Sequence, residues 1–229
     1  MKICGLQKLT LLDYPGRVAC TVFLGECNFR CPWCHNYELA AGEWPVVLDQ
    51  DELMKFLKSR VGQLDGVVIS GGEPCLNPDL IDLLKEIKAL RYHIKLDTNG
   101  TRPEMLHRLI ERNMLDYIAM DIKAGPLKYP SVTGLGTCDL ASIRKSINII
   151  MTSGVGYEFR TTVIRELHDE SDFFAIATMI EGARRYFLQP FRDSAYVPYN
   201  GFHAPDDETM KHYAHIVAGS VEEVRIRSS

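Results

Sequence analysis

The sequence has no long apolar run and no surplus of basic charge, and each absence removes a class of function. Its 229 residues contain no stretch approaching the ~18 apolar residues that a membrane-spanning helix needs. The formal net charge is −4, whereas a nucleic-acid-binding protein is expected to present a basic face. The N-terminus, MKICGLQKLTLLDYPG, lacks the apolar core and cleavage site of a secretory signal. We therefore expect a cytoplasmic protein with neither a membrane nor a nucleic acid as partner.

Cysteine is sparse outside one short segment, and this distribution argues against a disulfide framework. The sequence has seven cysteines, an odd number, and Cys27, Cys31 and Cys34 crowd together. Such crowding is poor geometry for disulfides and good spacing for a metal. Because a free cysteine commonly behaves as a small buried apolar residue, we expect the scattered ones to be structural, namely Cys4, Cys20, Cys75 and Cys138.

No repeat, low-complexity tract or Pro/Ser-rich linker divides the chain, so we expect a single domain over residues 1–229. In it we expect an N-terminal lead-in at 1–16, a core at 17–200, and a C-terminal helix and strand at 201–229. Short apolar runs alternate with helical patterns. These runs predict strands at 18–23, 66–70, 93–98, 117–123, 157–164, 185–191 and 221–227.

The segments between these runs carry helix-start patterns. Asn77 before Pro78 predicts one start, Thr101 with Glu104 predicts a capping box, and Asp139 predicts an N-cap. Two more helices are expected at 169–183 and 206–219.

Strand–helix alternation predicts parallel βα units. An eight-unit barrel takes about 250 residues, so this chain has room for six units and a last strand. The expected fold is therefore α/β, an incomplete (β/α)6 barrel of the TIM type, with a doubly wound open sheet as the alternative. Either fold places the chemistry at the carboxyl ends of the strands.

The strongest motif, CNFRCPWC, follows the first predicted strand and holds Cys27, Cys31 and Cys34. Three thiolates on one tight loop suit three irons of a cubane and leave the fourth without a protein ligand, whereas electron carriers use four cysteines. The amino and carboxylate groups of a methionine moiety are natural chelators for that open iron. We therefore interpret the loop as the site of a [4Fe–4S] cluster that cleaves S-adenosylmethionine.

Two alternatives apply to this loop. A zinc knuckle would need a fourth ligand, and His35, next to Cys34, is awkwardly placed for that role. Trp33, inside the loop, is expected to lie against an adenine, with simple packing as the alternative.

The second predicted strand ends in Ser70-Gly71-Gly72-Glu73-Pro74. A glycine pair lets backbone approach a ligand closely, and Glu73 is a candidate acceptor from an ammonium group. A plain turn is the alternative interpretation.

The next strand ends carry charges on runs that should be buried. A carboxylate there is costly unless it is paired or ligated. Asp97 and Asp121 are expected to face each other around a cation, with Lys123 nearby for a carboxylate. The alternative is an Asp–Lys ion pair that only closes the barrel mouth. Arg160, in the following strand, is expected to be paired or to face a ligand.

Together these motifs resemble the radical S-adenosylmethionine superfamily. The resemblance rests on Cys27–Cys34, GGEP at 71–74, DTNG at 97–100 and AMDIK at 119–123. The lead-in LLDYPG at 11–16, followed by VACTVF and CNFRCPWCHN, is similar to the glycyl-radical-enzyme activating enzymes, and most of all to those of anaerobic ribonucleoside-triphosphate reductase.

The resemblance implies a role for each site residue. It implies that the three cysteines bind the cluster and that Trp33 sits by the adenine. It implies that Gly71, Gly72, Glu73 and Pro74 hold the methionine amino group. A monovalent cation beside the methionine carboxylate is implied among Asp97, Thr98, Asp121 and the carbonyl of Ala119, with Lys123 near that carboxylate and Arg160 facing the cofactor.

The resemblance also implies an activity. It implies an activase that installs a glycyl radical on anaerobic ribonucleoside-triphosphate reductase, with flavodoxin or ferredoxin as reductant. The alternatives are an activase of another glycyl radical enzyme, of the pyruvate formate-lyase type, and a small-molecule enzyme such as 7-carboxy-7-deazaguanine synthase. An activase must admit a polypeptide, and we expect a chain of this length to leave the barrel mouth uncovered.

Two details bear on this comparison. The family often has glycine immediately before the first cluster cysteine, whereas this chain reads Gly25-Glu26-Cys27. Many relatives carry extra cysteines after the first motif, but none lies between Cys34 and Gly71 here, so we expect one cluster.

Overall fold

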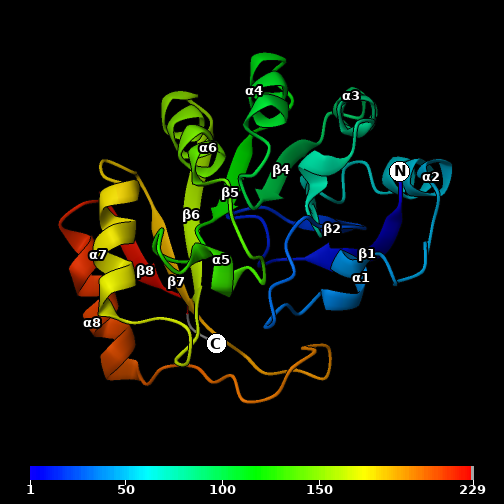
Figure 1. Cartoon of the computed structure of the whole chain (residues 1–229). Coiled ribbons are helices and arrows are strands. Elements are labelled where there is room, and N and C mark those ends of the chain that lie inside the picture. The colour runs from blue at the N-terminus through cyan, green and yellow to red at the C-terminus, as the bar shows by residue number, and fades with distance from the viewer. Residues whose placement is uncertain (228–229) are drawn as a thin grey trace.

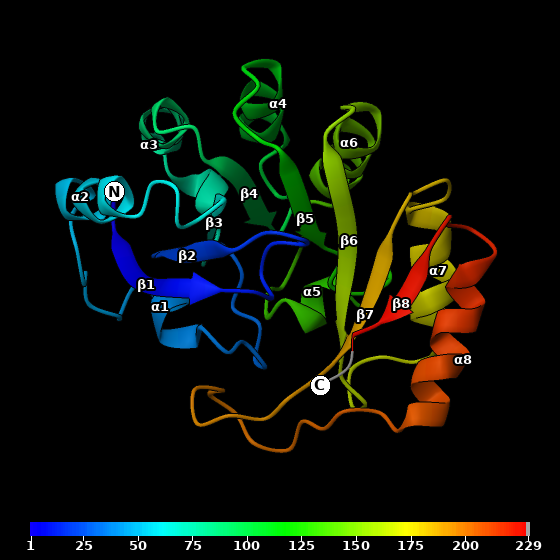
Figure 2. The same cartoon turned by 180° about the vertical axis from the view of Figure 1, so that it is seen from behind.

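The computed structural model describes residues 1–227, and its centre is one eight-stranded sheet whose strands follow chain order. The strand β1 runs antiparallel to β2, and every later pair of neighbours is parallel. The sheet curls, but within the described residues β1 and β8 do not pair (Figures 1 and 2). The strands are β1 Ile3–Thr10, β2 Ala19–Leu24, β3 Gly66–Gly71, β4 His93–Thr98, β5 Tyr117–Asp121, β6 Gly156–Val163, β7 Tyr186–Pro190 and β8 Val224–Ile226.

Helices cover the outside of this curved sheet (Figure 1). In α3, for example, Leu80, Leu83, Leu84 and Ile87 are fully buried, and burying one such side chain contributes about 1.5–3 kcal/mol. No helix within residues 1–227 combines the length and apolarity that crossing a membrane requires. The helices are α1 Tyr37–Ala41, α2 Gln50–Ser59, α3 Leu80–Ala89, α4 Pro103–Glu111, α5 Tyr129–Val132, α6 Leu140–Thr152, α7 Glu170–Met179 and α8 Asp207–Ala218.

The predicted incomplete barrel is confirmed. Six strand–helix units run from β2 to β7, and β8 follows as the last strand. Every predicted strand is present, with its ends shifted by at most a few residues. The Asp139 cap is also confirmed, because its carboxylate accepts from the Ser142 backbone N–H at 3.1 Å.

No strand was predicted within the N-terminal lead-in at 1–16, but this segment contains β1. This strand lies at the sheet edge, and Gln7 and Lys8 on it are exposed, so its apolar pattern is incomplete. The single domain itself stays a prediction, and its last residues, 228–229, lie outside the described part of the chain.

Two predicted helix starts were also wrong. Asn77 does not cap α3, which begins at Leu80; the Asn77 N–H instead closes a short 3-10 turn at Pro74–Leu76 by donating to the Pro74 carbonyl at 3.0 Å. Thr101 forms no capping box before α4, because its hydroxyl donates to the Asn99 side chain at 2.6 Å. Local hydrogen bonds in the turns that follow β3 and β4 therefore engage both residues outside the helices.

The segment 191–206 crosses below the sheet between β7 and α8, and we refer to it as the strap. Figures 1 and 2 show it in orange, running from the end of β7 toward α1 and back. Its Arg192 carbonyl lies 2.5 Å from His35 Nε2, and Tyr199 packs edge-on against Tyr37. The expectation of an uncovered mouth is therefore wrong in part, since the strap spans one side of it.

Candidate active site

A cavity of about 200 Å³ lies at the carboxyl ends of β2 to β6. It brings together almost all of the site residues predicted from the sequence. Glu73 and Pro74 are not among the lining residues. The predicted residues that line it are Cys27, Cys31, Trp33, Cys34, Gly71, Gly72, Asp97, Thr98, Asp121, Lys123 and Arg160.

The cysteine loop between β2 and α1 is fixed by backbone hydrogen bonds at several points. The Cys27 N–H donates to the Ala40 carbonyl at 3.0 Å, and the Arg30 N–H donates to the Thr133 carbonyl at 2.9 Å. Within the loop, the Cys34 N–H donates to the Cys31 carbonyl at 3.1 Å. The Arg30 guanidinium also donates to the Cys27 carbonyl at 2.5 Å. These hydrogen bonds hold the loop backbone in place and so fix the positions of the three cysteines.

The sulfur atoms form a donor set that fits an iron–sulfur cluster. Cys27 Sγ accepts from the Phe29 N–H at 3.4 Å and from the Asn99 side-chain amide at 3.7 Å, and donors of this kind tune such clusters. Burial raises the pKa of Cys27 to about 11 and that of Cys31 to about 12. Since metals bind the deprotonated sulfur, cluster binding here must release protons.

Zinc finds less support. In residues 1–227, no three His, Cys, Asp or Glu side chains are grouped to hold one metal ion. A cubane takes one cysteine per iron, so its ligands need not meet at one point. His35, the proposed fourth zinc ligand, has its Nε2 on the Arg192 carbonyl.

The glycine pair at the end of β3 lets two backbones touch. A Cβ on Gly71, which has φ +117, would lie 2.2 Å from the Leu24 carbonyl oxygen. A Cβ on Gly72 would lie 1.9 Å from the Glu26 carbonyl oxygen. Because both obstacles are backbone atoms, no side chain fits at either position, and the end of β3 packs directly against the segment that leads into Cys27.

Glu73 does not face the cavity as the sequence suggested. It is fully buried, and its carboxylate accepts from the Thr98 hydroxyl at 2.8 Å, the Asn99 N–H at 2.6 Å and the Cys75 N–H at 3.0 Å. Burial raises its pKa despite these donors. All of its contacts are inside the protein, so Glu73 ties the end of β3 to the end of β4 and is not placed to accept from a ligand ammonium.

The charged residues on β4 and β6, and those at and just after the end of β5, form one row of alternating charge. Arg160 Nε lies 2.8 Å from Asp121 Oδ1, and Lys123 Nζ lies 3.0 Å from Asp121 Oδ2. Arg160 also reaches Asp97 at 3.6 Å, and the buried Lys95 pairs with Asp97 from the other side. The two carboxylates therefore share a guanidinium, where the sequence predicted a free cation between them.

Electrostatics keep this row ionised. Burial opposes the charge on Asp121, but the Arg160 and Lys123 charges outweigh it and hold the pKa of its carboxyl below the ordinary value. Asp97 is shifted the same way, since Arg160 and Lys95 outweigh burial and lower its pKa. Lys123 is raised in pKa by Asp121 in spite of its burial.

Trp33 forms part of the cavity wall. Its side chain is buried, and its Nε1–H donates to the Val132 carbonyl at 3.0 Å. Lys123 Nζ lies 5.1 Å from the centroid of the ring, in cation–π contact. Ala119 lies opposite Asp97 in the β4–β5 ladder. The adenine contact and the cation site at the Ala119 carbonyl stay predictions.

Sequence reasoning missed three residues of the site. Asn99 lines the cavity and donates to Asn28 Oδ1 at 3.0 Å, which joins β4 to the cysteine loop. Ser70 also lines it and donates to Asp97 Oδ2 at 3.1 Å. Both belong to strand-end motifs already singled out. Lys95 had no such signal, because a lysine in a strand is ordinarily expected at the surface.

The comparisons with known proteins agree with this geometry. Residues 21–175 match the family model described as the radical SAM superfamily. A protein of Methanocaldococcus jannaschii, provisionally named a glycyl-radical enzyme activating enzyme, is 29% identical over 99% of this chain and 95% of its own length. The pyruvate formate-lyase-activating enzyme of Clostridium pasteurianum is 30% identical over 75% of this chain and 72% of its own.

Solved structures support the fold. A domain of the pyruvate-formate lyase-activating enzyme of Bacteroides vulgatus superposes with a TM-score of 0.58 at 21% identity, covering 71% of this chain and 99% of that one. The chain therefore belongs to the radical SAM superfamily. It is a radical SAM enzyme, which uses a [4Fe–4S] cluster and S-adenosylmethionine, and its homologues include proteins named glycyl-radical enzyme activating enzymes.

Proposed function

We propose that the protein installs a glycyl radical on a partner enzyme, and that this partner is anaerobic ribonucleoside-triphosphate reductase. The observation that carries the activase assignment is the similarity over 99% of this chain to a relative named for that activity. The choice of the reductase rests on the motif resemblance of LLDYPG at 11–16 and the CNFRCPWCHN loop.

The cavity supplies the parts that this activity needs. When bound, the cluster and S-adenosylmethionine supply the radical that abstracts hydrogen from a glycine Cα. The hydrogen-bonded loop between β2 and α1 would hold the cluster through Cys27, Cys31 and Cys34. Lys123 and Arg160 would hold the methionine carboxylate, and Trp33 would lie by the adenine. Gly71 and Gly72 would bring backbone close to the methionine amino group.

The charge on the row favours such a ligand. Lys95, Arg160 and Lys123 carry three positive charges against the two carboxylates of Asp97 and Asp121, which leaves one positive charge. One carboxylate of a ligand would neutralise it. Because the side chains are largely shielded from water, their interaction with that carboxylate is screened less than at a surface.

We further propose that the chain acts as a single radical SAM domain in the cytoplasm. The reducing cytoplasm suits a cluster held by cysteine sulfur. The electron would come from a flavodoxin or ferredoxin, and a monovalent cation would complete the site if the bound ligand draws Arg160 away from Asp97 and Asp121.

The test mixes anaerobically reconstituted, reduced protein with S-adenosylmethionine and the anaerobic ribonucleotide reductase of the same organism. We expect a stable glycyl doublet in the EPR spectrum of the reductase and one 5′-deoxyadenosine per radical. A doublet only on a pyruvate formate-lyase-type partner would keep the activase and reject the reductase. Turnover of a small molecule without any doublet, as by a 7-carboxy-7-deazaguanine synthase, would reject the activase.

A further inference from the structure

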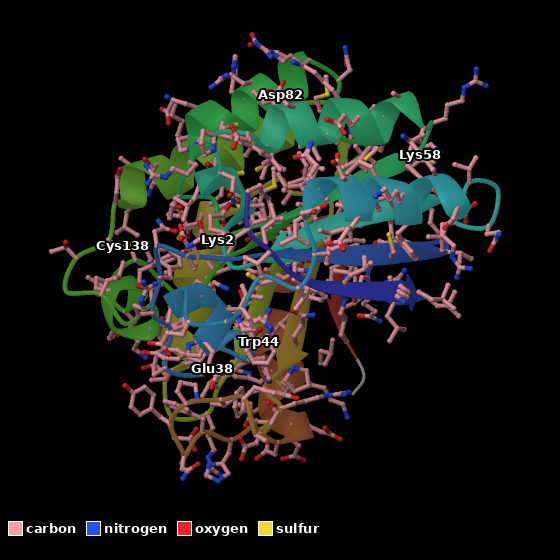
Figure 3. All side chains as sticks on the ribbon, turned by 90° about the vertical axis from the view of Figure 1, so that its right-hand side faces the viewer. Lys2, Glu38, Trp44, Lys58, Asp82 and Cys138 are labelled. Atoms are coloured by element: carbon pink, nitrogen blue, oxygen red, sulfur yellow. The ribbon has the colours of Figure 1, made fainter. Side chains whose placement is uncertain are left out.

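A second cavity, of about 210 Å³, lies beside the active site on the side spanned by the strap. Its walls come from β1, β2, the segment that contains α1, and the strap. Figure 3 views the molecule from this side and labels Trp44 and Glu38 next to α1. The lining residues are Cys4, Gly5, Phe23, His35, Asn36, Tyr37, Glu38, Leu39, Trp44 and Tyr196.

The chemistry of this cavity suits an apolar guest. Aromatic and aliphatic side chains dominate its walls, and no lysine or arginine is among its lining residues. A phosphate or carboxylate ligand would therefore have no lysine or arginine to pair with. An apolar or aromatic side chain would instead contact several aromatic rings, and such contacts are typical anchors in protein–protein recognition.

The cavity adjoins the active site. His35, Asn36 and Tyr37 line both cavities, and they follow directly after Cys34. A chain in extended conformation advances about 3.3–3.6 Å per residue, so a polypeptide anchored in the second cavity carries its next residues toward the first. A small molecule confined to the active site would not contact this second cavity.

The outer wall of the cavity is accessible. Tyr196, on the strap, is 64% exposed, and Trp44 is 37% exposed. Their rings meet edge-on with centroids 6.5 Å apart. The strap forms neither helix nor strand, so Tyr196 can adjust to a guest without breaking a helix or a sheet ladder.

We propose that this aromatic cavity binds an apolar or aromatic side chain of the partner polypeptide, a few residues from the glycine that receives the radical. The proposal rests on the proposed function and adds to it the part of the partner that is recognised. The occupant is a segment of a second protein, anchored between Trp44 and Tyr196.

The experiment measures equilibrium binding of the fluorescently labelled partner enzyme to reconstituted protein with S-adenosylmethionine. Tyr196→Ala and Trp44→Ala should each raise the Kd by about tenfold, as expected for truncated aromatic anchors. The control is Phe174→Ala on α7, an aromatic residue that is 55% exposed and lines neither cavity; it should keep the wild-type Kd. Melting temperatures establish that each variant is folded.

The outcomes separate the two proposals. Wild-type protein that installs the radical, with Kd values unchanged in Tyr196→Ala and Trp44→Ala, would overturn the aromatic anchor and leave the activase. Dimeric wild-type protein that becomes monomeric in these variants would show that a second copy of this chain fills the cavity, which also overturns the proposal. Wild-type protein that binds no glycyl radical enzyme would overturn the proposed function and the anchor with it.

Discussion

Arg160 donates from its Nε to Asp121 across 2.8 Å, and the two residues are direct partners in the β5–β6 ladder. The same guanidinium reaches Asp97 on β4, so one arginine of β6 links the carboxyl ends of β4 and β5. Two aspartates buried side by side would repel each other, and the arginine between them offsets that cost. The site is therefore organised by its own cations before any ligand binds.

Arg160→Lys should weaken S-adenosylmethionine binding by about tenfold while the iron content stays unchanged. A lysine keeps the charge but loses the planar fork that reaches two carboxylates. Isothermal titration with S-adenosylmethionine measures the effect, and Arg108→Lys, on the exposed face of α4, is the control. Equal affinities for Arg160→Lys and wild type would show that the arginine has only a structural role.

Lys95→Met should lower the free energy of unfolding by about 3 kcal/mol, because breaking a buried ion pair leaves Asp97 less well compensated. The Lys95 side chain is only 2% exposed. Lys85→Met breaks the exposed pair with Asp82 and should cost less than about 1 kcal/mol. Denaturant unfolding measures the free energy of unfolding of both variants. Equal losses of that free energy would contradict a stabilising buried pair at Lys95.

Glu26→Gly should raise the free energy of unfolding by about 1 kcal/mol, because Glu26 has φ 70, a left-handed conformation that disfavours a side chain. This is the position where the family often has glycine. The substitution also removes an exposed ion pair with Lys2, which contributes little. Lys2→Met removes the same pair without relieving the backbone, so it should not stabilise. Destabilisation by Glu26→Gly would be the contrary result.

The strands and most of the site could be predicted from the sequence because they depend on local patterns. Apolar runs marked β2 to β8, and polar residues at their ends marked Asp97, Asp121 and Arg160. The partners of these residues could not be predicted in the same way, since they depend on register between strands. Glu73 was therefore predicted to contact the ligand, because its real partners were unknown. In the fold its carboxylate accepts from Thr98 and Asn99.

The edge strand β1 and the strap were harder still to predict from the sequence. The exposed residues of β1 interrupt its apolar pattern, and the strap has no pattern of either helix or strand. What fixes the strap is contact with residues far away in sequence, such as the edge-on contact of Tyr196 with Trp44. No local motif reports such a contact.

His168 should make the folded protein less stable as the pH falls below about 6.5, the ordinary value for histidine. Its Nδ1 accepts from the Ile164 N–H at 3.1 Å, and its Nε2 lies 2.8 Å from the Lys123 carbonyl, which suits the neutral ring. Burial lowers the pKa of His168. The unfolded chain therefore takes up a proton first, and stability present above about pH 6.5 is lost as the pH falls toward the lower folded pKa.

Thermal unfolding at about pH 7.5 and about pH 5.5 tests this, because the slope can reach about 1.4 kcal/mol per pH unit for one proton. His168→Gln should lose less stability between the two pH values than wild type does. An identical loss in both proteins would assign the pH dependence to other groups.

The central claim, that Cys27, Cys31 and Cys34 hold a cluster with one iron open to S-adenosylmethionine, is tested most directly by EPR of the reduced, anaerobically reconstituted protein. We predict about four irons per chain and a reduced-cluster signal that shifts when S-adenosylmethionine is added. The variant with all three cysteines replaced by alanine should show neither, while Cys138→Ala should show both. A cluster signal that persists in the triple variant, or a wild-type signal that S-adenosylmethionine leaves unchanged, would contradict the account.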